Sequence, residues 1–229
     1  MSTTPIAQNL NAVLQEIAAA ARDGGRDPDD VRLVAVSKNA SCNEIRQAYD
    51  AGQRHFGENR VQALCRKAEQ LPEDIHWHFI GHLQRNKVAR VLPVAGLVHS
   101  IDSERLLRHI NRHADEACPQ EILIQVDLAG EESKFGVTRE EAIALAQLAV
   151  DLEGVACRGF MTMAPYGAEA EELENIFEDL WGIREYMREQ HALLMPELSM
   201  GMSMDYRAAI AAGATLVRIG TAIFGPASA

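Results

Sequence analysis

Short apolar runs alternate with amphipathic stretches along most of the chain. Eight runs have the length of a strand, and the stretches between them have the spacing of a helix with one apolar face. Alternating strands and helices predict a parallel sheet, and near-continuous apolar strands predict burial of both its faces. The expected strands lie at residues 31–37, 54–56, 75–80, 97–101, 121–127, 155–161, 198–200 and 215–219.

Local signals place the ends of several helices. The capping boxes Ser41-Cys-Asn-Glu44 and Thr138-Arg-Glu-Glu141 each predict a helix start. Left-handed helix ends are expected at the pairs Ala51-Gly52, Ala95-Gly96 and Ala212-Gly213. Helices are expected at residues 3–22, before the first strand, and at 61–71, 85–92, 103–117 and 169–191. Eight repeated units favour a closed (β/α)8 TIM barrel over an open doubly wound sheet, and no Gly-x-Gly-x-x-Gly follows the first strand.

Length and composition narrow the class of protein. The 229 residues suit one barrel domain spanning residues 1–229, since such barrels take about 250 residues. No apolar run is long enough to cross a bilayer and the N-terminus lacks signal-peptide features, so a cytoplasmic protein is expected. The net charge of -11 and the absence of a basic cluster argue against nucleic acid as a partner. The four scattered cysteines indicate neither a zinc site nor disulfides, and no metal is expected.

Two glycine turns near the C-terminus form a candidate phosphate cradle. Gly201-Met202-Ser203 is expected to open a helix with Ser203 as its cap. Gly220-Thr221 follows the last strand and leads into a stub too short for a full helix. Barrels of this class often hold phosphate in the loops after strands seven and eight. The alternative is that these glycines only end helices and allow tight turns.

The chain has four lysines, so any lysine chemistry has few candidates. Lys38 follows the first strand, at the mouth of a barrel expected to be dry, where its ammonium form would be penalised and its amine could attack an aldehyde. Alternatively, Lys38 pairs with Glu58. Lys67 is expected on an exposed helix face and Lys87 facing solvent, while Lys134 lies in the loop 130–136.

Arg218 ends the eighth strand, beside the candidate cradle. It can either pair with Asp205 or donate to an acceptor nitrogen on a ligand ring. His76 and His78 lie on one side of a strand, and we interpret them as packed, hydrogen-bonded histidines rather than metal ligands. Lys38 together with a phosphate cradle indicates a phosphorylated aldehyde, for which pyridoxal phosphate is one candidate. A sugar-phosphate aldolase is the competing interpretation.

Five long motifs carry a resemblance to a known family. They are Val34-Ala-Val-Ser-Lys38, Phe56-Gly-Glu-Asn59, Trp77-His-Phe-Ile-Gly-His-Leu-Gln-Arg-Asn-Lys87, Leu198-Ser-Met-Gly-Met-Ser203 and Val217-Arg-Ile-Gly-Thr-Ala-Ile-Phe-Gly225. In order and spacing they resemble the pyridoxal phosphate homeostasis protein family, the YggS/PROSC-like proteins. The match spans about residues 33–225.

The resemblance implies a barrel similar to the N-terminal domain of alanine racemases, with pyridoxal phosphate as cofactor. It implies that Lys38 is the Schiff-base lysine and that Arg218 faces the pyridine nitrogen. The implied phosphate-binding residues are Ser203, Gly220 and Thr221, and the implied neighbours of the cofactor are Asn59 and His82. The chain departs from the family pattern at Asn39-Ala40, Arg60 and Asp127, where Thr-Lys, Tyr and Asn are common.

The resemblance also implies a function, which is to bind, buffer or deliver pyridoxal phosphate. We expect a monomeric carrier with apo-enzymes as recipients and no catalytic role, because an arginine opposite the pyridine nitrogen disfavours ring protonation. The chain also leaves no room for the second domain that supplies the tyrosine base of racemases. The alternative is a weak amino-acid racemase or lyase whose base is Tyr166, His82 or Lys134.

Overall fold

The structure is a computed structural model that describes residues 4–130 and 135–226. Its strands are β1 (Arg32–Val36), β2 (His55–Glu58), β3 (His76–Phe79), β4 (Ala95–Ile101), β5 (Gln120–Gln125), β6 (Val155–Met161), β7 (Glu197–Ser199) and β8 (Leu216–Ile219). Its α-helices are α1 (Pro5–Asp23), α2 (Cys42–Asp50), α3 (Val61–Ala68), α4 (Val88–Val91), α5 (Glu104–Asn111), α6 (Arg139–Val150), α7 (Ala170–His191), α8 (Tyr206–Ala211) and α9 (Thr221–Phe224). Two short 3-10 helices are η1 (Pro28–Asp30) and η2 (Arg85–Lys87).

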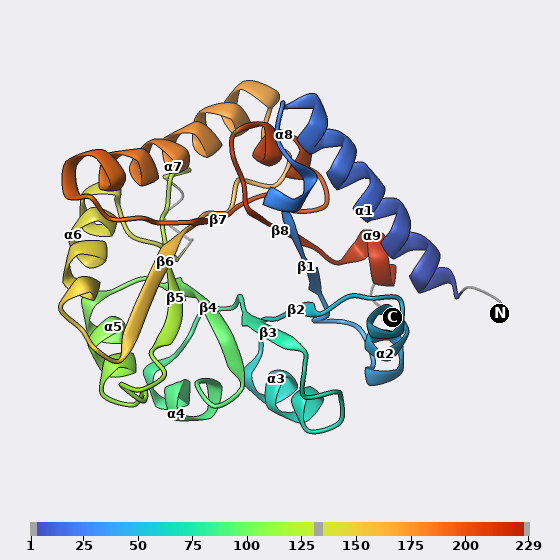
Figure 1. Ribbon diagram of the computed structural model, residues 1–229, viewed down its shortest axis with the longest axis horizontal. Coiled ribbons are helices and arrows are strands. Elements are labelled where there is room, and N and C mark those ends of the chain that lie inside the picture. The colour runs from blue at the N-terminus through green and yellow to red at the C-terminus, as the bar shows by residue number, and fades with distance from the viewer. Residues whose placement is uncertain (1–3, 131–134, 227–229) are drawn as a thin grey trace.

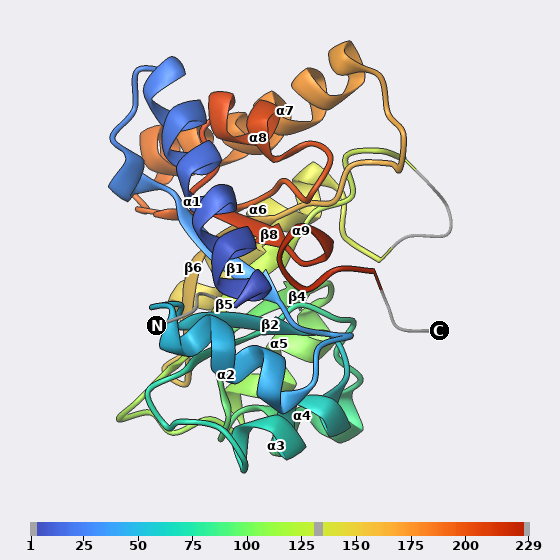
Figure 2. The ribbon, with the colours of Figure 1, turned by 90° about the vertical axis from the view of Figure 1, so that its right-hand side faces the viewer.

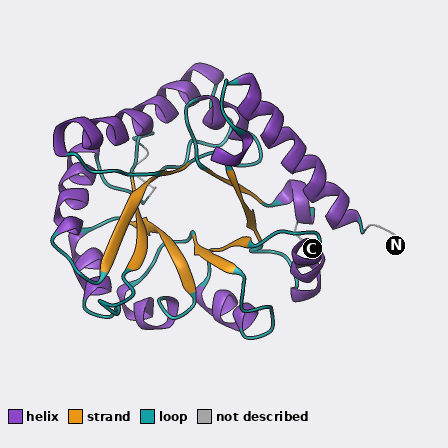
Figure 3. Ribbon diagram, viewed as in Figure 1, coloured by secondary structure: helices purple, strands orange, loops and turns teal. Residues whose placement is uncertain are grey.

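The strands close into one parallel barrel in the order in which they occur along the chain (Figure 1). The barrel closes where β1 pairs with β8, from Arg32 opposite Leu216 to Ala35 opposite Ile219. Helices surround the ring of strands on its outside (Figure 3). The predicted (β/α)8 fold is therefore confirmed, and the expected N-terminal helix is α1.

Apolar side chains fill both the barrel and the layer outside it. The smaller cluster takes one residue from each of five strands: Val34, Leu97, Leu123, Met161 and Leu216. In β1 the neighbours of Val34 belong to the larger cluster, which includes buried helix residues such as Ile45 and Phe177. Successive residues of a strand point to opposite faces, so β1 packs inward through Val34 and outward through Leu33 and Ala35.

The predicted helix signals hold at most positions. Both capping boxes form, at the starts of α2 and α6. Gly52 and Gly213 have φ of 105° and 100°, the left-handed conformation that glycine adopts without a steric penalty. The prediction for Ala95-Gly96 was wrong, because the preceding helix ends earlier and both residues belong to β4.

Three expected helices are shorter than their patterns, and the one at 61–71 ends as α3 at Ala68. The expected helix at 85–92 divides into η2 and α4, and the expected helix at 103–117 ends as α5 at Asn111. Just beyond α5, Asp115 Oδ1 accepts from the Ala117 amide at 2.9 Å, and the Asp115 carbonyl accepts from Cys118. A short acidic side chain that bonds to nearby amides offers the backbone an alternative to the helix.

Gly159 in β6 should not tolerate a side chain. Its φ is 147°, and an added Cβ would lie 1.9 Å from the carbonyl oxygen of Glu197 on the paired strand β7. Gly159→Ala should therefore lower the free energy of unfolding by about 2–3 kcal/mol, measured by urea denaturation. Gly96→Ala in β4 is the matched control, since its nearest neighbour would be 3.8 Å away. Equal stability of the two variants would contradict the prediction.

Candidate functional site

A cavity of about 600 Å³ lies at the carboxyl ends of the strands. In Figure 2 this end of the barrel is on the right-hand side, beside α9. The lining combines apolar side chains with a few polar ones, as is usual for small-molecule sites. It consists of Val36, Lys38, Asn59, Ile80, Met163, Pro165, Tyr166, Gly167, Ala168, Leu173, Met202, Ser203, Met204, Asp205, Arg218 and Thr221.

Most of the predicted binding residues meet at this cavity. Those that line it are Lys38, Asn59, Ser203, Arg218 and Thr221. Gly220 immediately precedes Thr221 and is the N-cap of α9. His82 lies outside the lining: its Nδ1 is 3.1 Å from Asp102 Oδ2, and its ring stacks on Phe135 with the centroids 3.9 Å apart. The barrel thus brings together residues from both ends of the chain and leaves His82 outside the lining.

Lys38 lies in the turn after β1, and its side chain is exposed. The expectation of a dry environment at this position was therefore wrong, since Lys38 is exposed although it lines the cavity. Glu58, the carboxylate suggested as its partner, is fully buried and forms an ion pair with Lys67 instead. Lys38 thus lines the cavity from an accessible position.

Lys67 was predicted to be exposed, and that prediction was wrong. Its side chain is 3% exposed, and its Nζ lies 2.5 Å from Glu58 Oε1 and 2.7 Å from the carbonyl oxygen of Ser37. The Ser37 hydroxyl donates to the same Glu58 oxygen at 3.0 Å. Lys67 follows Val61 and Leu64 at helical spacing on the buried face of α3, a signal that could have revealed its burial. Because Ser37 precedes Lys38 and Glu58 precedes Asn59, this cluster fixes the starts of two loops of the site.

Arg218 is 4% exposed and reaches the cavity from β8. Its Nη1 donates to Ser199 Oγ at 2.6 Å, and its Nη2 donates to the carbonyl oxygen of Thr162 at 2.9 Å. Burial lowers the pKa of Arg218 to about 10, and the negative charge of Asp205 opposes this shift. Both partners in these bonds are neutral, so neither of them neutralises the positive charge of the guanidinium. Its remaining N–H groups can donate to a ligand.

The turn at Gly201 differs from the predicted one in its cap. The helix expected to begin at Ser203 begins at Tyr206, and the side-chain oxygen that closes the turn belongs to Asp205, which accepts from the Met202 amide. Gly201 has φ of 90°, and an added Cβ would lie 2.6 Å from the Cβ of Ala209. The glycine is therefore required by close packing and backbone conformation, while the Ser203 side chain stays available at the cavity.

Backbone amides are available at both glycine turns. No hydrogen bond among residues 4–130 and 135–226 uses the amides of Ser203, Met204, Thr221 or Ala222. At the second turn an added Cβ on Gly220 would lie 2.9 Å from the carbonyl oxygen of Val36, so glycine lets α9 approach β1. Successive free amides around a concave turn form an anion-binding arrangement. The predicted cradle thus has suitable geometry after β7 and β8.

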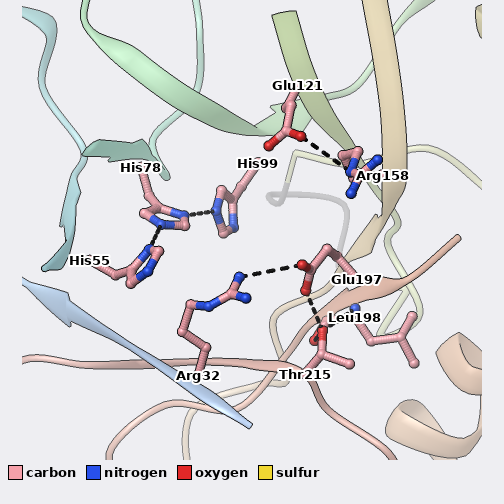
Figure 4. A network of polar contacts seen from close by, with 9 residues as sticks. All are labelled: Arg32, His55, His78, His99, Glu121, Arg158, Glu197, Leu198 and Thr215. Carbon is pink, nitrogen blue, oxygen red and sulfur yellow. Dashed lines mark hydrogen bonds and ion pairs between the residues drawn. The ribbon is translucent and has the colours of Figure 1, made fainter. Parts of the chain in front are cut away.

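Histidines occupy part of the barrel interior. His78 is buried and lies 3.0 Å from His55 and 2.9 Å from His99, measured between ring nitrogens (Figure 4). Its interpretation as a packed, hydrogen-bonded histidine is confirmed, whereas His76 is exposed and stacks on His55. Burial lowers the pKa of His78 to about 3 and that of His99 well below its usual value, and neighbouring charges add to both shifts. No group of metal-ligating side chains occurs in the described parts of the chain.

These histidines should make stability depend on acid. His78 stays neutral in the folded protein but titrates near pH 6.5 when unfolded, so the unfolded state binds more protons below that pH. Between neutral pH and pH 5 this single group should lower the free energy of unfolding by about 2 kcal/mol. Denaturant titrations at pH 7.5 and 5 would measure the loss, with His78→Gln as the comparison. An equally large loss in that variant would assign the effect to other groups.

Of the three residues suggested as catalytic bases, the two that the structure describes are not held in the cavity as firmly as Arg218 is. Tyr166 lines the cavity, but its side chain is 98% exposed. His82 bonds to Asp102 outside the lining, and Lys134 lies outside the described residues.

Within the described ranges no helix is long and apolar enough to span a membrane.

The chain is similar to known proteins over nearly its whole length. Residues 8–228 match the family model for the alanine racemase N-terminal domain. The chain is 38% identical over 220 residues to the pyridoxal phosphate homeostasis protein of Aquifex aeolicus, covering 95% of this chain and 96% of that one. It is 41% identical over 229 residues to the protein of that name from Vibrio alginolyticus, covering 96% and 97%. Among solved structures it is similar to PipY of Synechococcus elongatus with PLP (pyridoxal phosphate) bound, with a TM-score of 0.81, 39% identity, and coverage of 93% of this chain and 100% of that one.

Proposed function

Because this chain belongs to the pyridoxal phosphate homeostasis protein family, we propose that it binds pyridoxal phosphate at the carboxyl end of its barrel and contributes to the homeostasis of that cofactor. The observation that carries the proposal is that Lys38 and the buried Arg218 line one cavity beside two turns with free amides. The volume of about 600 Å³ lies within the range of small-molecule sites.

The residues present fit the chemical groups of this cofactor. The Lys38 amine is accessible for covalent attachment to an aldehyde. The guanidinium of Arg218 can only donate, so it suits an acceptor nitrogen of the ring and keeps that nitrogen unprotonated. The free amides at Ser203 and Thr221, with Gly220 allowing the close approach, suit the phosphate. When bound, pyridoxal phosphate supplies a reactive aldehyde and an electron-withdrawing ring.

In this proposal the protein is a monomeric cytoplasmic carrier that delivers the cofactor to apo-enzymes and is not itself an enzyme. In the proposed arrangement Arg218, rather than a carboxylate, faces the pyridine nitrogen, which weakens the ring as an electron sink. The one candidate base among the lining residues, Tyr166, is almost fully exposed, and no hydrogen bond within the described chain fixes the position of its hydroxyl.

Loading the purified protein tests the binding proposal. Added pyridoxal phosphate should bind at one equivalent per chain and produce a visible absorption band, whereas a sugar-phosphate aldehyde should not compete for the site. A protein that stays colourless and cannot be loaded would overturn the proposed function. Competition by the sugar phosphate, with an imine that forms only on its addition, would favour the aldolase interpretation.

A solvent-exchange experiment separates carrier from enzyme. The loaded protein is incubated with amino acids in deuterium oxide, and incorporation at the α-carbon is followed by mass spectrometry. A carrier should give no exchange above that of free cofactor. Exchange that disappears in Tyr166→Phe would instead establish the weak racemase or lyase activity, with Tyr166 as its base.

A further inference from the structure

The histidine bonds of the barrel interior continue to the cavity. His99 Nδ1 lies 2.9 Å from Ser199 Oγ, the hydroxyl that also accepts from Arg218. A single series of hydrogen bonds therefore runs from His55 through His78, His99 and Ser199 to Arg218. These residues stand on β2, β3, β4, β7 and β8, and the series crosses the barrel at the step from His99 to Ser199, since β4 and β7 are not neighbours.

Counting protons fixes the direction of these bonds. A guanidinium has no acceptor, so the bond between Arg218 and Ser199 uses an arginine proton. The Ser199 side chain is fully buried, and its own hydroxyl proton needs an acceptor. Its other partner is His99 Nδ1, which must therefore be the unprotonated ring nitrogen.

The tautomers of the other histidines follow from this one. With Nδ1 as acceptor, neutral His99 carries its proton on Nε2 and donates to His78 Nδ1. His78 then carries its proton on Nε2 and donates to His55 Nδ1. In each bond of the series the group nearer to Arg218 is the donor, so each group presents its acceptor atom toward the guanidinium. The lowered pKa values of His78 and His99 agree with the neutral rings that this order requires.

We propose that His99, oriented by His78, is a positioning residue for the ring end of the cavity: it directs the Ser199 hydroxyl proton away from Arg218, so that the hydroxyl oxygen accepts from the guanidinium and holds it toward the bound pyridine ring. The inference rests on the proposed function for the identity of the ring. The orientation of Ser199 and Arg218 belongs to the protein itself and can be measured without ligand.

The tautomers are tested first, in the ligand-free wild-type protein. Two-bond nitrogen–proton correlation spectra of ¹⁵N-labelled protein should show the Nε2–H form for both His78 and His99. A proton on Nδ1 of His99 would overturn the proposal, because Ser199 would then have no acceptor there. This measurement requires no variant to fold.

Substitution of His99 provides the second test. His99→Gln keeps an acceptor and a donor on one side chain, His99→Leu removes both, and His76→Ala alters an exposed ring outside the series. Solvent exchange of the Arg218 guanidinium protons should accelerate at least about tenfold in His99→Leu, and affinity for pyridoxal phosphate should fall about tenfold. His99→Gln should recover most of both losses, and His76→Ala should resemble wild type.

The outcomes separate this inference from the proposed function. Unchanged guanidinium exchange in His99→Leu would overturn the positioning role, and so would faster exchange with unchanged affinity for pyridoxal phosphate. If His99→Leu does not fold, the same comparison is made between His99→Gln and wild type, where a large loss of affinity would count against the proposal. Failure of the wild type to bind pyridoxal phosphate would refute the proposed function, while the tautomers and the exchange rates would still test the series of bonds.

Discussion

Replacing Lys38 by alanine should abolish covalent attachment of pyridoxal phosphate and leave only weak binding. Lys38 is the lysine among the described residues that lines the cavity, and alanine removes the amine that would bond to the aldehyde. The loss should weaken binding on the order of a hundredfold, the equivalent of about 3 kcal/mol. After borohydride reduction of the loaded wild type, peptide mapping should find the pyridoxyl group on Lys38 alone.

Matched controls make this result specific. Lys87→Ala removes a half-buried lysine outside the cavity lining and should leave loading unchanged. Lys38→Ala should unfold at the same denaturant concentration as ligand-free wild type, because the side chain it removes is exposed. A pyridoxyl group on Lys87 or Lys134, or full loading of Lys38→Ala, would reject the assignment.

Lys67→Met should lower the free energy of unfolding by about 3–5 kcal/mol. The change leaves the fully buried Glu58 carboxylate without its ion partner, and Glu58 Oε2 already has no hydrogen-bond partner. The Ser37 carbonyl loses a donor in the same step. Urea denaturation of both proteins at neutral pH measures the difference.

The cost should come from the uncompensated charge rather than from the lost side chain. Glu58→Gln combined with Lys67→Met removes both charges and should recover part of the stability, because neutral groups are less costly to bury. Arg66→Ala, an exposed position on the same helix, should change stability by less than about 0.5 kcal/mol. A loss below about 1 kcal/mol in Lys67→Met would show that the pair contributes little.

The sequence predicted the barrel because its signals are local and repeated. Strand-length apolar runs, capping boxes and glycine turns each depend on a few neighbouring residues, and eight similar units leave few possible topologies. The convergence of Lys38 and Arg218 on one surface followed from the same logic, since all loops after the strands of a barrel share one end.

The polar interior was beyond the reach of the same approach. The partner that His99 contacts across the barrel, Ser199, lies 100 residues further along the chain, and pairing across a barrel depends on its register and tilt. Ala95-Gly96 had the composition of a helix end, yet tertiary pairing recruited it into β4. Exposure of Lys38 was also missed, because a position at the end of a strand does not tell how deep its side chain lies.

The pairing of β1 with β8 has a consequence for biosynthesis. Lys38 follows the first strand to leave the ribosome, and Arg218 belongs to the last, so the two sides of the cavity are about 180 residues apart in the order of synthesis. A nascent chain that has not yet released β8 lacks one wall of the cavity. Any ligand held by both residues therefore connects the two edges where the barrel closes, and it can be held in this way only after β8 has been synthesised.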